Sequence, residues 1–375
     1  MTDALAWLAD AAAARERAGL HRALRSRGPG AGADGLDLAS NDYLGLARHP
    51  AVVAAAVAAL EAYGAGATGS RLVTGTTDAH GDLEAALAAR TGTERGLVLS
   101  SGYLANLAAV TALTGPGALV VSDAANHASL VDACRLSRAD VVVVPHRDPA
   151  AVRAALAARR APRALVVTDA VFSVDGALAP LAALHDAARA HGAALLVDEA
   201  HALGVVGPAG AGAAAAAGLA GEPDVVLTAT LSKALGSQGG AVLGPAAVRA
   251  HLVDTARPFI FDTGLAPSAA AAARAALDLV DAPRLQRLHD VVAALAGALG
   301  TAPSAGAVLR VPVGDPAAAV AAQQACARAG VRVGCFRPPS VPAGGSCLRL
   351  AARADLGPAD VARAAAVVRE ALALR

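Results

Sequence analysis

Lysine is almost absent from this chain of 375 residues. The sequence contains 32 basic residues, yet Lys233 is its single lysine, and arginine fills every other basic position. A drift toward arginine codons would explain this bias without any function. Arginine can replace lysine as a surface charge, but it cannot form an imine because its guanidinium group stays protonated. The one retained lysine is therefore a candidate amine nucleophile.

The sequence also lacks a dominant charge and long apolar runs. Its net charge is +1, which gives no electrostatic reason to expect a nucleic acid or a membrane surface as partner. Charge or proline interrupts the apolar tracts before they reach the length of a membrane span. The first residues carry Asp3 and Asp10 and lack the basic start and apolar core of a signal peptide. We therefore expect a cytoplasmic protein.

Cysteine patterns that bind metals are missing as well. The four cysteines form no CxxC pair and have no histidine cluster beside them. This pattern favours structural thiols over a metal site or disulfides, so we expect no metal. The cysteines are Cys134, Cys326, Cys335 and Cys347.

Two short motifs match known signatures but lack the required context. The segment 64–69 reads GxGxxG, but it follows a predicted helix and continues into a loop, whereas a dinucleotide-binding motif leaves a strand and opens a helix. The segment 198–201 reads DEAH, as in helicases, but the chain has no Gly-Lys pair and hence no phosphate-binding loop of an NTPase. A dinucleotide-binding oxidoreductase is therefore disfavoured, and a helicase is excluded.

Alternating apolar runs and helical segments predict an α/β fold. Such runs, with many β-branched residues, indicate a parallel sheet covered on both faces. The expected strands are 96–99, 118–121, 141–144, 164–167, 193–197, 225–227 and 241–243. Helices are expected at 4–24, 50–63 and 78–90, a short strand at 36–39, and an Ala/Gly-rich loop with a helical turn at 209–221.

The pattern changes near residue 281 and predicts a second domain. The expected helices there are 285–299, 316–329 and 358–374, and the expected strands are 308–313, 331–336 and 347–350. We predict a large domain at 46–280, a small C-terminal α+β domain at 281–375, and an N-terminal arm at 1–45 that joins the small domain.

An acid and the sole lysine are expected at one edge of the predicted sheet. Asp198 ends the buried run 193–197, and Lys233 follows the next apolar run. Ligands of open α/β sheets bind beyond the carboxyl ends of the strands. Pyridoxal phosphate (PLP) needs a lysine to hold its aldehyde and a carboxylate to keep its pyridine nitrogen protonated. Taken singly, each residue is better explained without a cofactor, as a surface lysine and a turn-capping aspartate.

Six motifs in order along the chain resemble those of the α-oxoamine synthases. The resemblance covers nearly the whole sequence, and six ordered motifs are far more specific than any one of them. The motifs are SNDYLGL at 40–46, SGY at 101–103, HASL at 127–130, VFSVDG at 171–176, TLSKALGSQGG at 230–240 and RPPSVP at 337–342.

This resemblance implies the architecture and the cofactor. The expected fold is that of the PLP-dependent transferases of fold type I, which is aminotransferase-like. It would have a seven-stranded, mostly parallel sheet in the large domain. The resemblance also implies PLP as cofactor and a homodimer with shared active sites.

The resemblance assigns residues to the cofactor ring. Lys233 would hold the cofactor and later remove the substrate α-proton. Asp198 would pair with the pyridine nitrogen, and His201 would hydrogen-bond the phenolic oxygen. His127 would stack on the ring and help to bind substrate, and Ser173 would hydrogen-bond the cofactor.

Other residues are assigned to the cofactor phosphate. Gly102 and Tyr103 are expected to begin a helix, whose first backbone N–H groups suit a phosphate. Thr230 and Ser232 would add hydroxyl groups. Thr263, in a segment resembling the family's, would reach the phosphate of the neighbouring subunit.

Three residues besides His127 are assigned to substrate. Arg337 would clamp the amino-acid carboxylate through a bidentate contact. Ser340 stands where the family commonly has threonine, so a hydroxyl is kept. Arg25 aligns with a basic residue near the acyl substrate, but Arg22 and Arg27 are equally close in the sequence.

One residue departs from the family pattern. The family usually has glycine after the histidine of DEAH, and this chain has Ala202. If that position needs a positive φ, alanine would cost about 1 kcal/mol.

The resemblance implies an acyltransferase that joins an amino acid to an acyl thioester with loss of CO2. The biotin-pathway member that the chain resembles most uses L-alanine and a pimeloyl thioester, with coenzyme A or an acyl-carrier protein as the carrier. Sister enzymes use glycine with acetyl-CoA, serine with palmitoyl-CoA or glycine with succinyl-CoA. A non-catalytic partner subunit is a further alternative, but such subunits lack the lysine.

Overall fold

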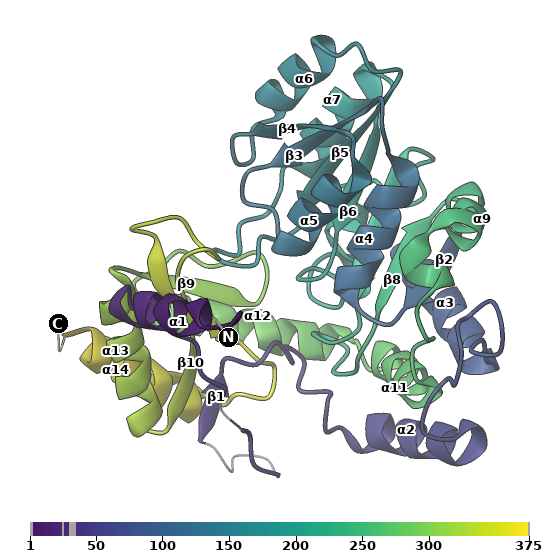
Figure 1. Ribbon diagram of the computed structural model, residues 1–375. Helices are drawn as coiled ribbons and strands as arrows, with labels where there is room; N and C mark the ends of the chain where they lie inside the picture. Colours follow the sequence, from purple (N-terminus) through teal and green to yellow (C-terminus); the bar gives the residue numbers. More distant parts are fainter. Residues whose placement is uncertain (1–2, 25, 30–34, 374–375) are drawn as a thin grey trace. The chain divides into compact units, whose positions relative to one another are not determined.

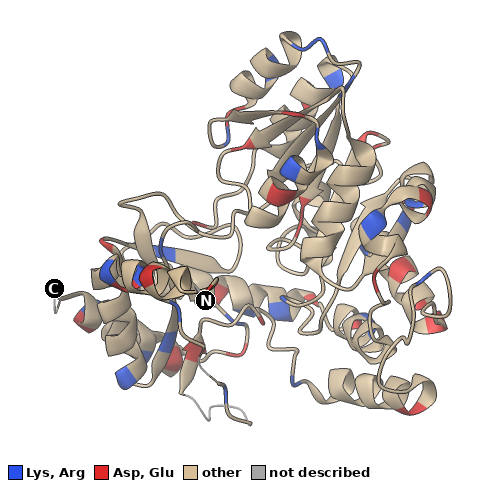
Figure 2. Cartoon of the chain, in the orientation of Figure 1, with Lys and Arg blue, Asp and Glu red and all other residues tan. Residues whose placement is uncertain are grey.

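The chain folds into two compact units, each described here by itself. The computed structural model describes residues 3–24, 26–29 and 35–373. The large unit comprises Asn41–Ser173 and Ala177–Leu288, and the small unit comprises Met1–Ser40, Val174–Gly176 and His289–Arg375. Figure 2 shows that basic and acidic residues are interspersed along the chain, in agreement with the net charge of +1.

A seven-stranded sheet forms the centre of the large unit (Figure 1). Its strand order is β2-β8-β7-β6-β5-β3-β4, and β8 alone runs in the direction opposite to the other six strands. All seven predicted strands are present, so the prediction of a mostly parallel sheet is confirmed. The strands are β2 (Arg95–Leu99), β3 (Ala118–Asp123), β4 (Asp140–Val144), β5 (Arg163–Asp169), β6 (Ala194–Asp198), β7 (Val225–Thr230) and β8 (Gly240–Gly244).

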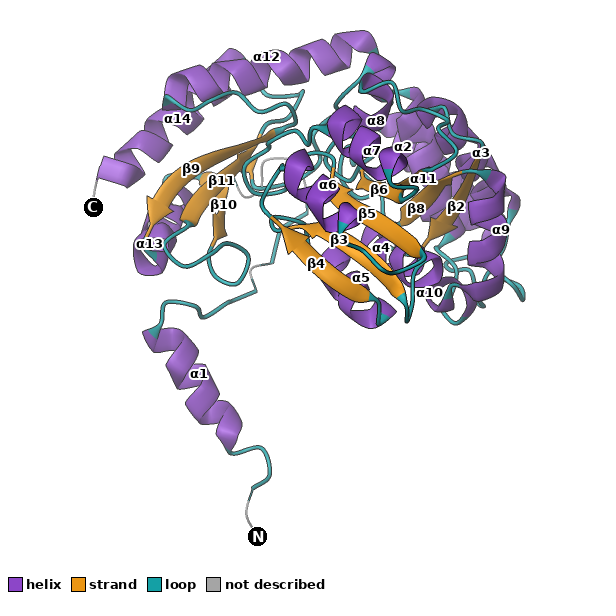
Figure 3. Ribbon diagram, turned by 90° about the horizontal axis from the view of Figure 1, so that it is seen from above, coloured by secondary structure: helices purple, strands orange, loops and turns teal. Residues whose placement is uncertain are grey.

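Helices cover both faces of this sheet (Figure 3). Helices α4 and α5 pack together on one face, and α6 and α7 pack together on the other. The helices of the large unit are α2 (Pro50–Tyr63), α3 (Asp78–Thr91), α4 (Gly102–Leu113), α5 (Ala128–Ser137), α6 (Pro149–Ala157), α7 (Leu181–Ala190), α8 (Ala213–Ala216), α9 (Ala246–Thr255), α10 (Arg257–Ile260) and α11 (Pro267–Asp278). Helix α12 (Ala282–Leu299) begins in the large unit and ends in the small unit.

Small side chains hold α4 close to the sheet. Ala105, Ala108 and Ala109 are fully buried in a core that also contains Val120 and Leu196. The methyl side chain of alanine adds little bulk, so the helix backbone can lie close to the strands. Burial of the apolar side chains between helix and sheet stabilises this packing. This close approach brings the first turn of α4 to the carboxyl ends of the central strands.

The small unit contains a four-stranded sheet of order β1-β10-β11-β9. Strand β1 (Leu36–Leu38) pairs in parallel with β10 (Val331–Phe336), which pairs antiparallel with β11 (Ser346–Ala351). Strand β9 (Val308–Gly314) completes the sheet, accompanied by α13 (Pro316–Arg328) and α14 (Pro358–Ala373). The unit is of the predicted α+β type.

The N-terminal helix is shorter than the predicted segment 4–24. Helix α1 covers Trp7–Arg17 and contains no buried residue. Gly19 has φ 65°, and the N–H groups of Gly19 and Leu20 bond back to the carbonyls of Glu16 and Arg15. A glycine in this left-handed conformation closes the last turn and ends the helix. No helix among the described residues is long and apolar enough to cross a membrane.

Candidate active site

The carboxyl ends of three neighbouring strands carry the polar groups of the site. Asp169 ends β5 and Asp198 ends β6, and the two are paired in the register of these parallel strands. Asp198 is likewise paired with Thr228 of β7, and Lys233 follows the end of β7 by three residues. The fold therefore brings the acid and the sole lysine to one edge of the sheet, where the sequence predicted them.

Asp198 is a buried hydrogen-bond acceptor. Asp198 is 6% exposed. Oδ1 accepts the backbone N–H of Ala200 at 2.9 Å, and Oδ2 accepts Nδ2 of Asn106 at 2.7 Å. These donors fix the carboxylate before any ligand is bound, because both oxygens are already oriented.

Asn106 is a site residue that the sequence reasoning missed. It lies on α4, is 2% exposed, and donates to Ser129 Oγ at 2.8 Å in addition to Asp198. Its Oδ1 accepts the hydroxyl of Thr228 at 2.6 Å. The sequence did contain a signal for Asn106, because it is the one polar residue in the apolar run 104–110 that follows the SGY motif. A buried amide needs hydrogen-bond partners.

His127 caps the first turn of α5. Its Nδ1 lies 2.7 Å from Ser129 Oγ and accepts the backbone N–H of Ser129 at 3.2 Å. Burial lowers the pKa of His127 below its ordinary value, and the positive charge of Lys233 lowers it further. Attraction to Asp198 and Asp132 opposes this shift without reversing it. The imidazole is therefore neutral near neutral pH.

His201 is held by the SNDYLGL motif. The hydroxyl of Tyr43 lies 2.7 Å from Nδ1 of His201 and donates to Oδ1 of Asn41 at 3.1 Å. Tyr43 is fully buried, so its ring fixes the position of the hydroxyl. The sequence identified this motif but assigned no role to Tyr43. The structure shows that Tyr43 orients one ring nitrogen of His201.

Asp169 is a second residue that the sequence reasoning missed. It is 3% exposed; its Oδ1 accepts the backbone N–H of His127 at 3.3 Å, and its Oδ2 has no partner. Burial raises the pKa of Asp169 well above its ordinary value, and the nearby charge of Asp198 adds to the rise. Asp169, with its raised pKa, therefore stands beside Asp198 at this edge of the sheet.

The first turn of α4 forms a cradle with the end of β7. Ser101 caps the helix by accepting the N–H of Leu104 at 3.1 Å, which leaves the N–H groups of Gly102 and Tyr103 without intrahelical acceptors. A Cβ on Gly102 would lie 2.9 Å from the Cβ of Thr230, so no larger residue fits there. The Thr230 and Ser232 hydroxyls lie 2.7 Å apart.

This cradle fits a phosphate group. Two N–H groups at a helix N-terminus supply donors, and the helix dipole favours an anion. The hydroxyls of Thr230 and Ser232 line the cradle, and that of Thr230 donates to the carbonyl of Gly239 at 3.2 Å. Tyr103 is 43% exposed, and its hydroxyl donates to Asp132 at 2.5 Å, which sets the direction of its ring. The edge of the sheet thus offers an amine, a buried carboxylate and an anion cradle, which together match the functional groups of PLP.

Ser173 and Thr263 lie in loops of the large unit. Ser173 follows β5 within a tight connection in which the N–H of Phe172 donates to the carbonyl of Ala177 at 2.9 Å. Thr263 is exposed and forms a β-bridge with Ser70. The GxGxxG segment therefore leads into a loop that supports Thr263, which agrees with the rejection of a dinucleotide site.

Of the residues assigned to substrate, His127 lies in the large unit, whereas Arg337 and Ser340 lie in the small unit. Arg337 donates to the backbone carbonyl of Gly19 and to that of His21 at 3.1 Å, and its buried Nε has no partner. Ser340 is exposed, and its N–H donates to the carbonyl of Arg337 at 2.9 Å. Arg22 donates to the carbonyl of Pro338 at 3.4 Å. Arg25 lies outside the described residues.

Ala202 is compatible with its backbone conformation. It is fully buried and is not among the residues with positive φ, whereas Gly204 has φ 77°. A Cβ on Gly204 would lie 2.8 Å from the Cβ of Ala234. The residue of this turn with a left-handed backbone is therefore Gly204, two residues after Ala202. Ala202 does not have a positive φ, so the backbone cost considered for alanine at this position does not arise.

Comparison with known proteins identifies the family. Residues 33–368 match the family model described as aminotransferase class I and II. A protein of Mycolicibacterium vanbaalenii named 8-amino-7-oxononanoate synthase is 62% identical over 99% of this chain and 98% of its own length. A protein of the same name from Mycolicibacterium smegmatis is 61% identical over 98% of this chain and 97% of its own length.

Solved structures agree with this result. Serine palmitoyltransferase from S. paucimobilis, with a bound PLP–myriocin aldimine, has a TM-score of 0.91 at 30% identity and covers 98% of each chain. An 8-amino-7-oxononanoate synthase from Francisella tularensis has a TM-score of 0.77 at 23% identity over 91% of this chain and 98% of its own, and shows the shared fold. The chain belongs to the aminotransferase class I and II family, and within it to the 8-amino-7-oxononanoate synthases.

Proposed function

We propose that this chain condenses L-alanine with a pimeloyl thioester to give 8-amino-7-oxononanoate, CO2 and free thiol, a step toward biotin. The observation that carries the proposal is the sole lysine, Lys233, at the same sheet edge as the buried carboxylate of Asp198. Relatives that are 62% identical over nearly the whole chain bear the name of this activity. Together these support a reaction that needs an amine-bound cofactor.

PLP is the cofactor, and the residues at the edge of the sheet fit it. Lys233 would hold its aldehyde carbon, Asp198 its pyridine nitrogen and His201 its phenolic oxygen. Ser173 would add a hydrogen bond, and His127 would cover one face of the ring. The cradle of Gly102, Tyr103, Thr230 and Ser232 would hold the phosphate. When bound, PLP supplies an electron sink for negative charge at the α-carbon of the amino acid.

Each protein group then has a defined task in the reaction. Arg337 binds the carboxylate of alanine and orients its α-carbon. The amine of Lys233 removes the α-proton, which allows the α-carbon to attack the thioester carbonyl and expel the thiol. Loss of CO2 from the condensed acid follows, and Lys233 can return a proton to the same carbon.

Arg337 must change partners to perform this task. Its guanidinium already donates to the carbonyls of Gly19 and His21. A substrate carboxylate accepts charge-assisted bonds, which are roughly twice as strong as bonds to neutral carbonyls. Alanine would therefore displace at least one backbone carbonyl from the fork. Ser340 and a basic residue among Arg22, Arg25 and Arg27 would contact substrate beside it.

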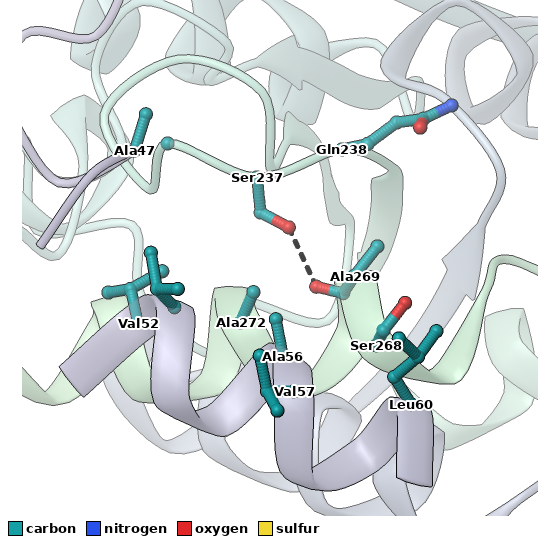
Figure 4. Close-up of a pocket in the computed structure, with 12 residues that line it drawn as sticks. Ala47, Val52, Ala56, Val57, Leu60, Ser237, Gln238, Ser268, Ala269 and Ala272 are labelled. Carbon is teal, nitrogen blue, oxygen red and sulfur yellow. Dashed lines mark hydrogen bonds between the residues drawn. The ribbon is translucent and has the colours of Figure 1, made fainter. Parts of the chain in front are cut away.

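A second copy of the chain would complete the site. The large unit carries a groove of about 370 Å³ between α2, α11 and the loop at Gly236 (Figure 4). Val53, Val57 and Leu60 of α2 are each about half exposed on its apolar wall. A homodimer would bury this surface and bring Thr263, which is exposed, to the phosphate of the other copy. Light scattering on the purified protein tests this assembly.

The cysteines bear on the compartment. All four are free, and three of them are buried. Unpaired thiols suit a reducing environment, so we place the enzyme in the cytoplasm. Fractionation of cells that express the protein tests this assignment.

The function itself is tested by an assay of thiol release over a matrix of substrates. Alanine, glycine and serine are combined with pimeloyl, acetyl, succinyl and palmitoyl thioesters, each carried by coenzyme A or by an acyl-carrier protein. Alanine with a pimeloyl donor should give the highest kcat/KM. Faster turnover with glycine and acetyl-CoA, or with serine and palmitoyl-CoA, would assign the chain to a sister activity. The comparison of carriers identifies the physiological acyl donor.

A further inference from the structure

A continuous chain of hydrogen bonds joins Asp198 to His127. Nδ2 of Asn106 donates to Oδ2 of Asp198 at 2.7 Å and to Oγ of Ser129 at 2.8 Å. Ser129 Oγ in turn lies 2.7 Å from Nδ1 of His127. Asn106 and Ser129 are 2% and 1% exposed, so water does not compete for these bonds.

The positions of the hydrogens in this hydrogen-bond chain can be assigned from its two ends, Asp198 and His127. A carboxylate oxygen only accepts, so the atom of Asn106 that faces Asp198 must be the amide nitrogen. The hydroxyl of Thr228 supports this orientation, because it donates to Oδ1 of Asn106 at 2.6 Å. The two hydrogens of the amide are then directed to Asp198 and Ser129.

The same reasoning fixes the protonation of the His127 ring. Ser129 Oγ receives a hydrogen from Asn106, and its own hydrogen can be donated to Nδ1 of His127. The backbone N–H of Ser129 also points to this Nδ1, at 3.2 Å. Two donors directed at one ring nitrogen leave no place for a hydrogen on it. In a neutral imidazole the hydrogen must then reside on Nε2.

We infer that Asn106 and Ser129 are positioning residues that hold His127 as the Nε2–H tautomer, so that its ring offers a donor to an oxygen of the reacting molecules. This inference rests on the proposed function, in which His127 contacts cofactor and substrate. The oxygen is a carboxylate or carbonyl oxygen, which only accepts. A ring with the opposite tautomer would present a lone pair to that oxygen and repel it.

The charges around His127 are consistent with this state. Asp198 from β6 and Asp132 from α5 favour a protonated ring, whereas Lys233 and burial oppose it. The pKa of His127 is lowered overall, because burial is the largest of these effects. The hydrogen-bond chain then selects the tautomer, which charge alone does not determine.

The direct test is the tautomer itself, measured by NMR on the full-length protein labelled with ¹⁵N-histidine, with and without PLP. The His127→Gln variant identifies the two nitrogen signals of His127. At about pH 7, where a neutral ring is expected, Nδ1 should resonate as a bare nitrogen and Nε2 as a protonated one. An Nδ1–H ring in the wild-type protein overturns the inference.

Two variants test the positioning residues. Ser129→Ala removes the hydroxyl donor, and Asn106→Asp replaces the amide donors with acceptors, so each should move the His127 nitrogens toward a mixture of tautomers. Ser129→Thr keeps the hydroxyl and should restore the wild-type pattern. Ser137→Ala is the matched control, because Ser137 is a buried serine of the same helix whose hydroxyl donates to the carbonyl of Cys134 and accepts the N–H of Ala139, away from the hydrogen-bond chain. Its His127 signals should not change.

Activity gives a second readout that separates this inference from the proposed function. In Ser129→Ala, kcat/KM for the amino acid should fall about 3- to 10-fold, the scale of one hydrogen bond, while the dissociation constant of PLP stays unchanged. Wild-type nitrogen shifts in both Ser129→Ala and Asn106→Asp refute the positioning role. If the shifts change as expected but alanine and pimeloyl thioesters are not turned over, the proposed function fails and the positioning role stands.

Discussion

The cofactor side and the substrate side of the proposed site differ in how far they are formed in advance. In the large unit, Asp198 and His127 are tied into one hydrogen-bond chain through Asn106 and Ser129. In the small unit, Arg337 donates to backbone carbonyls that lie at the start of the chain. The first set of groups already has the arrangement proposed for binding the cofactor, whereas the proposed role of Arg337 involves an exchange of backbone acceptors for a substrate carboxylate.

This difference has a physical consequence for binding and rate. A network that keeps its geometry on binding costs no reorganisation, so it can stabilise developing charge directly. An arginine that must exchange partners loses part of its binding energy to the bonds it breaks. Variants in the large unit should therefore change the reaction rate or the folding of the site, and variants at Arg337 should change substrate affinity.

The largest effect is expected at Lys233. Lys233→Ala removes both the proposed anchor of the cofactor and the proposed base, so kcat should fall by at least about 1,000-fold, near the upper range for a general base. The fold should persist, because Lys233 lies at the edge of the sheet and outside the core. The measurement is formation of the ketone product under saturating substrates.

Chemical trapping gives an independent check on Lys233. Borohydride should fix the cofactor to one peptide that contains residues 230–238, because the only other amine in the chain is the N-terminus. The Lys233→Ala protein serves as the control and should carry no label on that peptide. Label at the N-terminus, or a variant that turns over at the wild-type rate, contradicts the assignment.

A smaller effect is expected at Arg337. Arg337→Lys keeps the charge but loses the planar fork, so alanine affinity should fall by about 1–3 kcal/mol, roughly 5- to 150-fold. Cofactor binding should survive, since that part of the site belongs to the large unit. A spectral titration with alanine measures the affinity.

Arg363→Lys is the matched control for this variant. Arg363 also lies in the small unit and donates to a backbone carbonyl, that of Ala329 at 3.1 Å. It carries no predicted role, and alanine affinity should not change. Equal losses in the two variants would show that Arg337 acts through the structure of the small unit and not as a clamp.

Stability should depend on pH through Glu199, the neighbour of Asp198. Glu199 is fully buried and accepts the N–H groups of Ala213 and Ala214, yet burial raises its pKa to about 7 from 4.5. An acid whose pKa is raised in the folded state contributes stability below its unfolded pKa, and this contribution is lost as pH rises toward the folded pKa. The pH window is therefore about 4.5 to 7.

Glu199→Gln removes this titration. The difference between the two pKa values corresponds to up to about 3 kcal/mol. The free energy of unfolding of the variant, relative to wild type, should rise by up to this amount across the window, and urea unfolding at several pH values measures it. Asp186→Asn, a substitution on the exposed side of α7, is the control. A constant difference between Glu199→Gln and wild type would exclude this titration.

The smallest effects are expected in the turn after Asp198. Ala202→Gly should lower the free energy of unfolding by about 1 kcal/mol, because φ is not positive there and glycine adds backbone entropy to the unfolded chain. Gly204→Ala should cost more, since its φ is 77° and its Cβ would lie 2.8 Å from the Cβ of Ala234. Thermal unfolding measures both. Greater stability of Ala202→Gly would show that this turn prefers the glycine usual in the family.

The sequence by itself determined the sheet, the lysine and the motifs. Each central strand is a short apolar run with β-branched residues, and such runs are typical of strands in a parallel sheet that is covered on both faces. Lys233 stood out by count alone, and Asp198 by its place at the end of a strand. The end of α1 was less predictable, because Gly19 stops the helix within a segment whose composition remains helical.

Only the tertiary structure decided which polar residues meet. Asn106, Ser129 and Thr228 lie on three different elements, and their hydrogen bonds to one another and to Asp198 span up to 122 positions of sequence. Nothing in the sequence pattern around Asp169 distinguishes a buried acid with a raised pKa from an ordinary residue at a strand end. The reason is physical: a pKa or a tautomer is set by the partners and the solvent around a group, and those follow from packing.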